Sequence, residues 1–416
     1  MVNESVVMKT VDIAIIGGGM VGAAFALAML RARSDTTLAL VEAHFPQAPD
    51  LSAAPDLRVS ALSAGTVLLL QKLGAWDFIE AQRVQPYQRL RVSEHLGRHH
   101  VFAKHNTVRF DAESMGYQQL GFMVENAVTQ WGLWRALESF VDAGRLRLFS
   151  SEELGALADI QQDGEGVTLG FENGGDIVAK LLVGADGGRS SVRRLLQIPA
   201  PVKPYQQTVL AVGVELAQPA AQETWQVFKP SGPVALLPLM SVAGKHYAVL
   251  ICYDGSAANR YRQSLSDARL LDVLRSHYEG HLPDIIRVYG RAGFPLSRMH
   301  AQHYYQGKAV LIGDAAHTIN PLAGQGVNLG FQDLRALSRR LAFIDLADSV
   351  AVAQALAAYQ ALRKPENALM MHAMDAFYHG FSNDLPPLRL LRNLGLSAVG
   401  KAPWLQQQVL RHAMGL

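Results

Sequence analysis

A glycine-rich turn close to the N-terminus constrains the fold more than any other part of this sequence. The apolar run 11–16 leads into Gly17-Gly18-Gly19-Met20-Val21-Gly22, and an alanine-rich stretch from Val21 to Arg31 follows. A second apolar run, 37–41, ends at Glu42. Strand, tight turn, helix and second strand in this order predict a parallel βαβ unit, and therefore an α/β fold.

The spacing of Gly17, Gly19 and Gly22 gives this unit a chemical role. A Gly-x-Gly-x-x-Gly turn permits a tight reversal, lets a pyrophosphate approach the backbone and lets the helix pack closely on the strand. Amide groups at the helix N-terminus would bind the phosphates, and Glu42 would accept hydrogen bonds from the adenosine ribose. The unit predicts a dinucleotide site but does not separate NAD from FAD.

Two further loops end apolar runs far along the chain. The run 179–184 leads into Ala185-Asp186-Gly187, where Ser190 is placed to cap a helix that begins at Ser191. The run 309–312 leads into Gly313-Asp314 and then into a glycine-rich loop, ahead of a helix expected to begin near Gln325. An Asp-Gly turn by itself is an ordinary turn as often as a binding loop.

In order and spacing, the three loops together resemble the flavoprotein aromatic hydroxylases over most of the chain. The resemblance implies FAD, bound in a Rossmann-like domain of the para-hydroxybenzoate-hydroxylase type. It also implies an inserted antiparallel sheet that lines the substrate pocket. The first loop would hold the ADP part, Asp314 would accept hydrogen bonds from ribityl hydroxyls, and the N-terminus of the helix near Gln325 would face the isoalloxazine.

The resemblance also assigns FAD contacts to Arg58, within Arg-Val-Ser-Ala-Leu-Ser, and to Gln130, which opens Gln-x-x-Leu-x-x-x-Leu. Both are as compatible with surface positions when the residues are considered alone. The candidate cofactor-binding residues are Gly17, Gly19, Gly22, Glu42, Arg58, Gln130, Asp186, Gly313, Asp314, Pro321, Gly324, Gln325, Gly326 and Asn328.

The chemistry that the family implies is monooxygenation. NADH or NADPH binds transiently and reduces FAD, and O₂ then forms a C4a-hydroperoxyflavin that hydroxylates an electron-rich ring in a site protected from water. The catalytic candidates are His317, which either hydrogen-bonds near the flavin or orders its loop, and Pro321, through its carbonyl group and rigid turn. No metal is expected, and His95, His99, His100 and His105 are interpreted as loop histidines.

Three segments, 125–137, 313–333 and 377–396, are similar to the ubiquinone-biosynthesis branch of the family. The last is most similar to members that act on 2-polyprenyl-3-methyl-6-methoxy-1,4-benzoquinol, which implies a prenylated benzoquinol and O₂ as substrates. A sister hydroxylase acting on a prenylated phenol or methoxyphenol at another ring carbon stays open, as do an FAD-dependent dehydrogenase or oxidase and a non-enzymatic FAD-binding scaffold. The paired Glu-x-x-His motifs of a di-iron hydroxylase do not occur.

The three loops must meet in space, so the FAD-binding domain is predicted to be discontinuous, with segments 1–85, 115–200 and 295–380. Segments 86–114 and 201–294 then form the substrate domain, in which 209–216, 235–240 and 247–253 are predicted strands. Residues 381–416 form a basic, helical C-terminal tail. Its basic residues and leucines are compatible with contact to an anionic membrane surface, or with docking on the protein itself or on a partner.

Composition narrows the remaining function classes. The 416 residues carry a formal net charge of +2, which provides no electrostatic case for nucleic acid, and the single cysteine, Cys252, excludes an internal disulfide. Residues 13–30 carry no charge, but their glycines favour a strand and turn over a membrane span. The sequence predicts a cytoplasmic protein, and peripheral contact at the inner membrane surface and membership of a ubiquinone-biosynthesis complex stay open.

Overall fold

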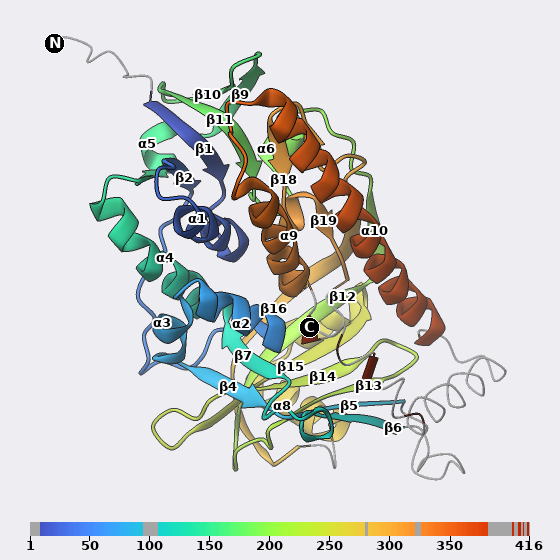
Figure 1. The fold of residues 1–416 in the computed structure, drawn as a ribbon. Coiled ribbons are helices and arrows are strands. Elements are labelled where there is room, and N and C mark those ends of the chain that lie inside the picture. The colour runs from blue at the N-terminus through green and yellow to red at the C-terminus, as the bar shows by residue number, and fades with distance from the viewer. Residues whose placement is uncertain are drawn as a thin grey trace.

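The computed structural model describes two large sheets, one small sheet and the helices that pack on them (Figure 1). The predicted α/β class is confirmed. None of the helices in the described ranges is long and apolar enough to cross a membrane. The described residues are 9–94, 107–278, 282–320, 326–381, 402, 407–408, 411 and 414–415.

The first sheet brings the three predicted loops to one edge. β1 (Lys9–Ile16) pairs in parallel with β11 (Asp176–Gly184) and with β2 (Leu38–Glu42), and β11 pairs in parallel with β18 (Ala309–Leu311). The carboxyl ends of parallel strands meet at the same edge, so the loops after β1, β11 and β18 lie together there. The remaining strands of this sheet are β8 (Leu146–Ser150), β9 (Leu157–Gln162), β10 (Val167–Phe171) and β17 (Tyr305–Gln306).

Four helices cover this sheet and the space beside it. α1 (Met20–Ala32) packs against both α4 (Asn126–Asp142) and α9 (Gly326–Leu341), and its residues 22–30 are all buried. Small alanine side chains on α1 allow these helices to lie close. α10 (Ser349–Phe381) packs on α9 and runs past both large sheets (Figure 1).

The second sheet has the order β19-β16-β12-β15-β14-β13-β5-β6 and is antiparallel except where β13 meets β5. β12 (Val202–Leu216) and β15 (His246–Gly255) contain the predicted strands 209–216 and 247–253, which are therefore confirmed, and β14 (Val234–Pro238) confirms the predicted strand 235–240 except for its last two residues. β19 (His317–Thr318), which follows the loop after β18, joins this sheet through β16 (Ile285–His300). The others are β5 (Arg89–Glu94), β6 (Thr107–Asp111) and β13 (Glu223–Phe228).

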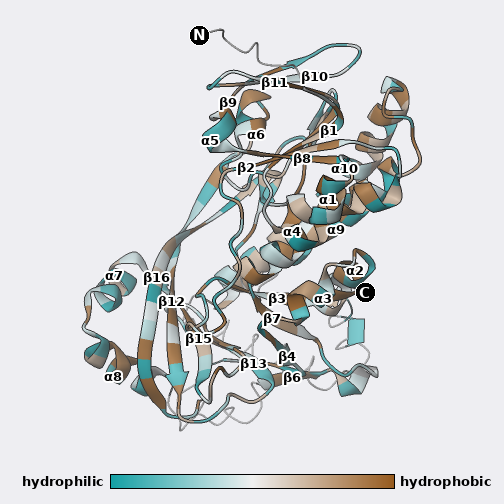
Figure 2. Ribbon diagram, turned by 90° about the vertical axis from the view of Figure 1, so that its left-hand side faces the viewer, coloured by the Kyte–Doolittle hydropathy of each residue, from teal (hydrophilic) through white to brown (hydrophobic). Residues whose placement is uncertain are grey.

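A third, small sheet of β3 (Val59–Ser63), β7 (Gly121–Glu125) and β4 (Val84–Tyr87) completes the strands. Viewed from the side, the first and second sheets occupy opposite ends of the molecule, with α1, α4 and α9 between them (Figure 2). The short helices are α2 (Ala64–Lys72), α3 (Trp76–Glu80), η1 (Glu113–Met115), α5 (Ser151–Leu154), α6 (Ser191–Leu195), α7 (Ser256–Ser264), α8 (Asp267–His277) and η2 (Gly313–Ala315).

We propose the division into a discontinuous FAD-binding domain and an inserted substrate domain for this chain. Segments 1–85, 115–200 and 295–380 contain every strand of the first sheet that the structure describes, and segments 86–114 and 201–294 contain most of the second. The boundary at 294/295 lies inside β16, so this strand begins in one proposed domain and ends in the other. Most of the predicted tail, 381–416, lies outside the described residues.

A matched pair of leucines tests the packing of α9. Leu334 is completely buried in the core of the first sheet, whereas Leu369 on α10 is 66% exposed. Leu334→Ala should lower the free energy of unfolding by roughly 3 kcal/mol, because it removes buried carbon atoms and leaves a cavity. In a chain of this length we expect a melting temperature about 3 °C lower, measured by calorimetry. Leu369→Ala is the control, and equal shifts in both variants would contradict the packing.

Candidate active site

The turn from β1 into α1 is packed so tightly that three of its glycines, Gly17, Gly18 and Gly22, have no room for a side chain. Gly17 has a φ of +100°, and a Cβ there would lie 2.4 Å from the carbonyl oxygen of Ala185. A Cβ on Gly22 would lie 1.9 Å from the carbonyl oxygen of Gly17. A Cβ on Gly19 would have nothing within 4 Å. Gly17 and Gly22 are thus required by packing, while the space beside Gly19 is available to a ligand.

Side chains from β2 and α4 fix this turn through Gly18. Glu42 Oε2 accepts a hydrogen bond from the Gly18 amide at 2.5 Å, and its Oε1 accepts one from the Ala43 amide at 3.0 Å. Gln130 Nε2 and Trp134 Nε1 both donate to the Gly18 carbonyl, at 3.0 and 2.8 Å. Gln130 therefore contacts the turn itself. Trp134 is not among the predicted cofactor-binding residues. Its position four residues after Gln130 could have indicated it, because residues at this spacing lie on the same face of a helix.

Asp186 joins this edge at the end of β11. Its Oδ2 accepts hydrogen bonds from the amides of Ser191 (2.7 Å) and Val192 (3.2 Å), and Ser190 caps α6 as predicted by accepting from the Arg193 amide at 2.9 Å. Burial raises the pKa of Asp186, against the opposing effect of these hydrogen bonds. Its Oδ1 is buried without a hydrogen-bond partner in the described part of the chain, and so is available to a ligand donor.

A buried carboxylate on α9, Asp333, fixes the loop after β18. Its Oδ2 accepts a hydrogen bond from the Gly313 amide at 3.1 Å and lies 2.5 Å from His317 Nε2. Its Oδ1 accepts from Arg363 Nε at 2.8 Å and from Asn367 Nδ2 at 3.1 Å. Burial alone would raise the pKa of Asp333, but His317 and Arg363 outweigh it and hold the pKa below its usual value. The carboxylate is therefore charged at neutral pH.

These contacts decide where His317 points. The residue is 1% exposed, and its Nε2 is bonded to Asp333. This position fits the ordering of the loop, one of the two roles considered for it, and we propose His317 as a positioning residue. Asp314, beside it on η2, is exposed at the same edge as Gly17 and Asp186. Pro321, Gly324 and Gln325 lie outside the described residues.

A cavity of about 710 Å³ lies between the second sheet and the elements β3, α4 and α9. Its volume is within the range of ligand sites. One side is formed by β3 and by the N-terminal ends of α4 and α9, through Arg58, Ser60, Ala61, Asn126, Gly326 and Val327. The opposite side is a mainly apolar face of β12 to β16, which includes Val209, Ala211, Gln226, Ala235, Leu237, Ile251, Tyr253, Ala292 and Phe294. Arg58 and Gly326, both candidate cofactor residues, thus line the cavity.

Asn328 connects α9 to this region without lining the cavity. Its Oδ1 accepts hydrogen bonds from the Ser63 amide (3.0 Å) and the Thr66 hydroxyl (2.8 Å), and its Nδ2 donates to the Ala61 carbonyl at 2.9 Å. The side chain therefore holds the start of α9 against β3 and α2. Gly326, the first residue of α9, is thereby fixed at the cavity with its helix N-terminus.

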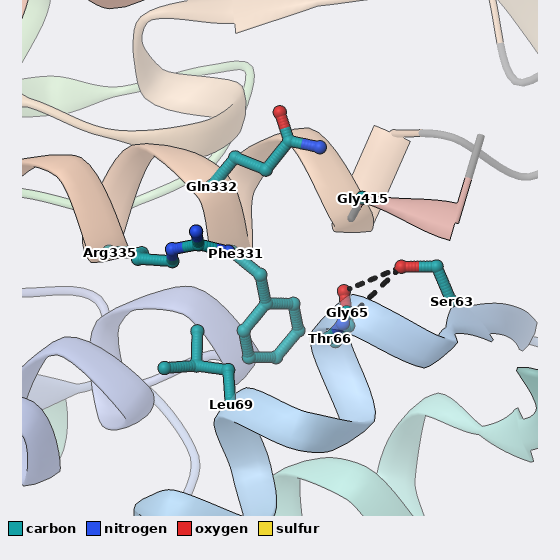
Figure 3. Close-up of a pocket in the computed structure, with 8 residues that line it drawn as sticks. All are labelled: Ser63, Gly65, Thr66, Leu69, Phe331, Gln332, Arg335 and Gly415. Atoms are coloured by element: carbon teal, nitrogen blue, oxygen red, sulfur yellow. Dashed lines mark hydrogen bonds between the residues drawn. The ribbon is translucent and has the colours of Figure 1, made fainter. Parts of the chain in front are cut away.

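A second recess, between α2 and α9, is too small for an organic ligand. It is lined by Ser63, Thr66, Phe331 and Gln332, with Gly415 of the C-terminal segment beside them (Figure 3). Its volume of about 10 Å³ is no more than one water molecule occupies. The described residues include no cluster of metal ligands, and His95, His99, His100 and His105 lie outside them.

The described residues fit an extended dinucleotide. Open backbone beside Gly19 and an unpaired buried oxygen on Asp186 lie at the edge of the first sheet, and the helix N-terminus at Gly326 lies at the cavity. The sequence matches the FAD binding domain family over residues 10–373. The chain therefore belongs to the FAD-binding family of flavin-dependent monooxygenases, and the predicted cofactor, FAD, is confirmed.

Closer relatives place the chain with the hydroxylases of ubiquinone biosynthesis. It is 40% identical to the 3-demethoxyubiquinol 3-hydroxylase of Escherichia coli (strain K12), over 97% of this chain and 98% of that protein. It is 31% identical to the ubiquinone hydroxylase UbiL of Rhodospirillum rubrum, over 98% of this chain and 90% of that protein. The p-nitrophenol 4-monooxygenase PnpA of Pseudomonas putida has the same fold, with a TM-score of 0.74, 18% identity and coverage of 98% and 99%.

Two glycines separate cofactor binding from packing. Gly19→Ala should fold normally but bind FAD at least about tenfold more weakly, because its methyl group enters the space left for the pyrophosphate. Gly22→Ala should lower the melting temperature of the FAD-free protein as well, because its methyl group clashes with Gly17. Flavin absorbance per protein and calorimetry measure the two effects. Full flavin content in Gly19→Ala would contradict the assignment of that space.

His300 should make the protein less stable in mild acid. Its Nε2 lies 2.7 Å from the Tyr304 hydroxyl, and burial, with smaller contributions from His317, Lys364 and His372, lowers its pKa to about 4. Between pH 6.5 and 4 the unfolded chain binds a proton here that the folded chain does not, so stability falls as the pH falls.

We therefore expect His300→Gln to reduce the loss of melting temperature between pH 7 and pH 4.5 by roughly 1–2 °C, a value discounted because His300 is only half-buried. His303→Gln, at an exposed position between β16 and β17, is the control and should follow the unchanged protein. A pH dependence that is identical in all three proteins would show that His300 is not the group responsible.

Proposed function

We propose that this protein hydroxylates the ring of a prenylated benzoquinol in ubiquinone biosynthesis. O₂ supplies the oxygen atom, and NADH or NADPH supplies electrons through FAD. The observation that carries the proposal is the 710 Å³ cavity, which has Arg58 and the N-terminal end of α9 on one side and an apolar sheet face on the other. The names of both relatives, a demethoxyubiquinol hydroxylase and a ubiquinone hydroxylase, support the same substrate class.

The candidate residues divide along the length of the cofactor. We propose that Gly17, Gly19, Gly22, Glu42 and Asp186 hold the ADP part, where the turn is tight and the Asp186 oxygen is unpaired. Gly313 and Asp314 would hold the ribityl chain, and Arg58 and Gln130 would contact the middle of the molecule. The isoalloxazine would lie against Pro321, Gly324, Gln325, Gly326 and Asn328 or the backbone beside them.

When bound, FAD supplies the redox and oxygen-activating chemistry, and the protein supplies position and environment. The N-terminus of α9 at Gly326 lies at the cavity, where its amide groups favour negative charge on a neighbouring ring. Apolar side chains such as Leu237, Ile251 and Phe294 exclude water from the opposite side. His317 and Asp333 act through the loop that they hold and exchange no proton with substrate.

The site is also compatible with the sister reaction on a prenylated phenol or methoxyphenol at another ring carbon, which stays open. We further propose that the C-terminal segment brings the enzyme to the inner membrane surface or to a complex of the same pathway, because its substrate is a lipid. Arg411, in this segment, is exposed, while Arg389, Arg392 and Lys401 lie outside the described residues.

Isotope labelling tests the reaction directly. Purified protein with NADH or NADPH, a short-chain prenylated benzoquinol and ¹⁸O₂ should yield a ring-hydroxylated product with one heavy oxygen, identified by mass spectrometry. The gene should also restore ubiquinone in cells blocked at one quinone hydroxylation step, and the step restored identifies the ring carbon. Substrate-dependent oxidation of the nicotinamide without labelled product would instead indicate a dehydrogenase or an oxidase.

A further inference from the structure

One face of the second sheet forms a wall of the cavity, and its strand register can be followed across five strands. Gln226, Ala235, Ile251, Ala211 and Ala292 lie opposite one another in a single line across β13, β14, β15, β12 and β16. All five line the cavity. We call this set the alanine line, because three of its members have no side-chain atom beyond Cβ.

The neighbouring positions on the same face carry larger side chains. Val209, Tyr253 and Phe294 lie opposite one another two residues along β12, β15 and β16, and Leu237 lies on the other side of the line on β14. Same-face neighbours in a sheet are about 7 Å apart. The alanine line is therefore recessed between bulkier side chains, which gives an apolar place for a ring and its attached chain.

Gln226 is the polar member of this line, and its side chain points into the cavity. Trp225, the residue before it, packs against Tyr278 in the core on the opposite side of the sheet, with ring centroids 5.6 Å apart. Successive side chains of a strand point to opposite faces, so Gln226 faces the cavity that it lines.

The amide of Gln226 opens to the cavity and has no hydrogen-bond partner among the described residues. The residue as a whole is only 7% exposed. Thr224, the next polar residue on this face of β13, differs because its hydroxyl donates to the Leu236 carbonyl at 2.7 Å. The donor and the acceptor of the Gln226 amide are therefore both available to a ligand in the cavity.

We propose that Gln226 determines substrate specificity by hydrogen-bonding one oxygen substituent of the substrate ring. A primary amide donates and accepts, so it pairs with a ring hydroxyl in either direction and donates to a methoxy oxygen. The inference rests on the proposed function, because a benzoquinol carries such oxygens. Arg58 is the charged residue among those described that line the cavity, and it lies on the flavin side, so the wall suits a neutral ring rather than a carboxylate.

Kinetics of Gln226→Leu with a set of analogues test the proposal. The analogues are short-chain prenylated benzoquinols in which each ring oxygen is removed in turn. With the complete substrate, Gln226→Leu should lower kcat/KM about 10- to 100-fold, the factor that one hydrogen bond to a buried polar group gives. With the single analogue that lacks the contacted oxygen, the variant and the unchanged protein should have the same kcat/KM.

Gln207→Leu is the matched control. Gln207 is also buried, but its amide donates to the Ser231 carbonyl at 2.8 Å and does not line the cavity. Its loss should lower the melting temperature and leave kcat/KM unchanged for every analogue. Flavin content should equal that of the unchanged protein in both variants, which excludes a general failure to fold. Equal losses with all analogues in Gln226→Leu would overturn the proposal.

A failure of the proposed function would appear differently. If the unchanged protein hydroxylates none of the benzoquinols, the substrate class is wrong. Binding of the same analogues, followed as a change in the flavin absorbance spectrum, then still decides the role of Gln226. A dissociation constant that rises about tenfold in Gln226→Leu for all but one analogue supports the hydrogen bond. Unchanged dissociation constants for every analogue refute it.

Discussion

The flavin site depends on one buried ion cluster, the carboxylate of Asp333 between His317 and Arg363. A charge with no access to water is tolerated only when it is paired and hydrogen-bonded, and removal of one partner leaves the rest unfavourably buried. Asp333 satisfies this condition with groups from three places: the loop after β18, β19 and α10. Because the buried Asp333 carboxylate needs these partners, it fixes the loop at Gly313 at the edge of the first sheet.

Part of this arrangement could be predicted from the sequence because its causes are local. The role of Gly17 and Gly22 could be predicted from the Gly-x-Gly-x-x-Gly spacing, because a turn between a buried strand and a closely packed helix has no room for a side chain at these positions. The cap at Ser190 could be predicted because its hydroxyl stands three residues before the Arg193 amide, which has no acceptor within the helix. The meeting of the loops after β1, β11 and β18 follows once the strands are taken as parallel neighbours.

The rest depends on contacts between residues distant in sequence. His317 was considered for a place near the flavin, but its partner lies on α9, and Arg363 completes the cluster from α10. Nothing near any of the three in sequence indicates the other two. The alanine line could not be predicted from the sequence for the same reason, because its members come from strands whose order in the sheet differs from their order in the chain. β12 also begins at Val202, earlier than the apolar run that predicted it, because pairing with β16 orders the exposed residues.

The length of β12 and β16 has a consequence for how the molecule handles a lipid. These strands are 15 and 16 residues long, and their ladder runs from Leu216 to Val202 with three shifts in register. The end of β16 at His300 is paired with His317 of the flavin loop. The cavity wall and the cofactor loop are thus joined through one strand ladder, which holds the apolar face of the second sheet at a defined place relative to the loop after β18. Side chains on β12 and β16 that face the cavity can therefore change in evolution, and with them the ring position that is oxidised, while the contacts to the cofactor are retained.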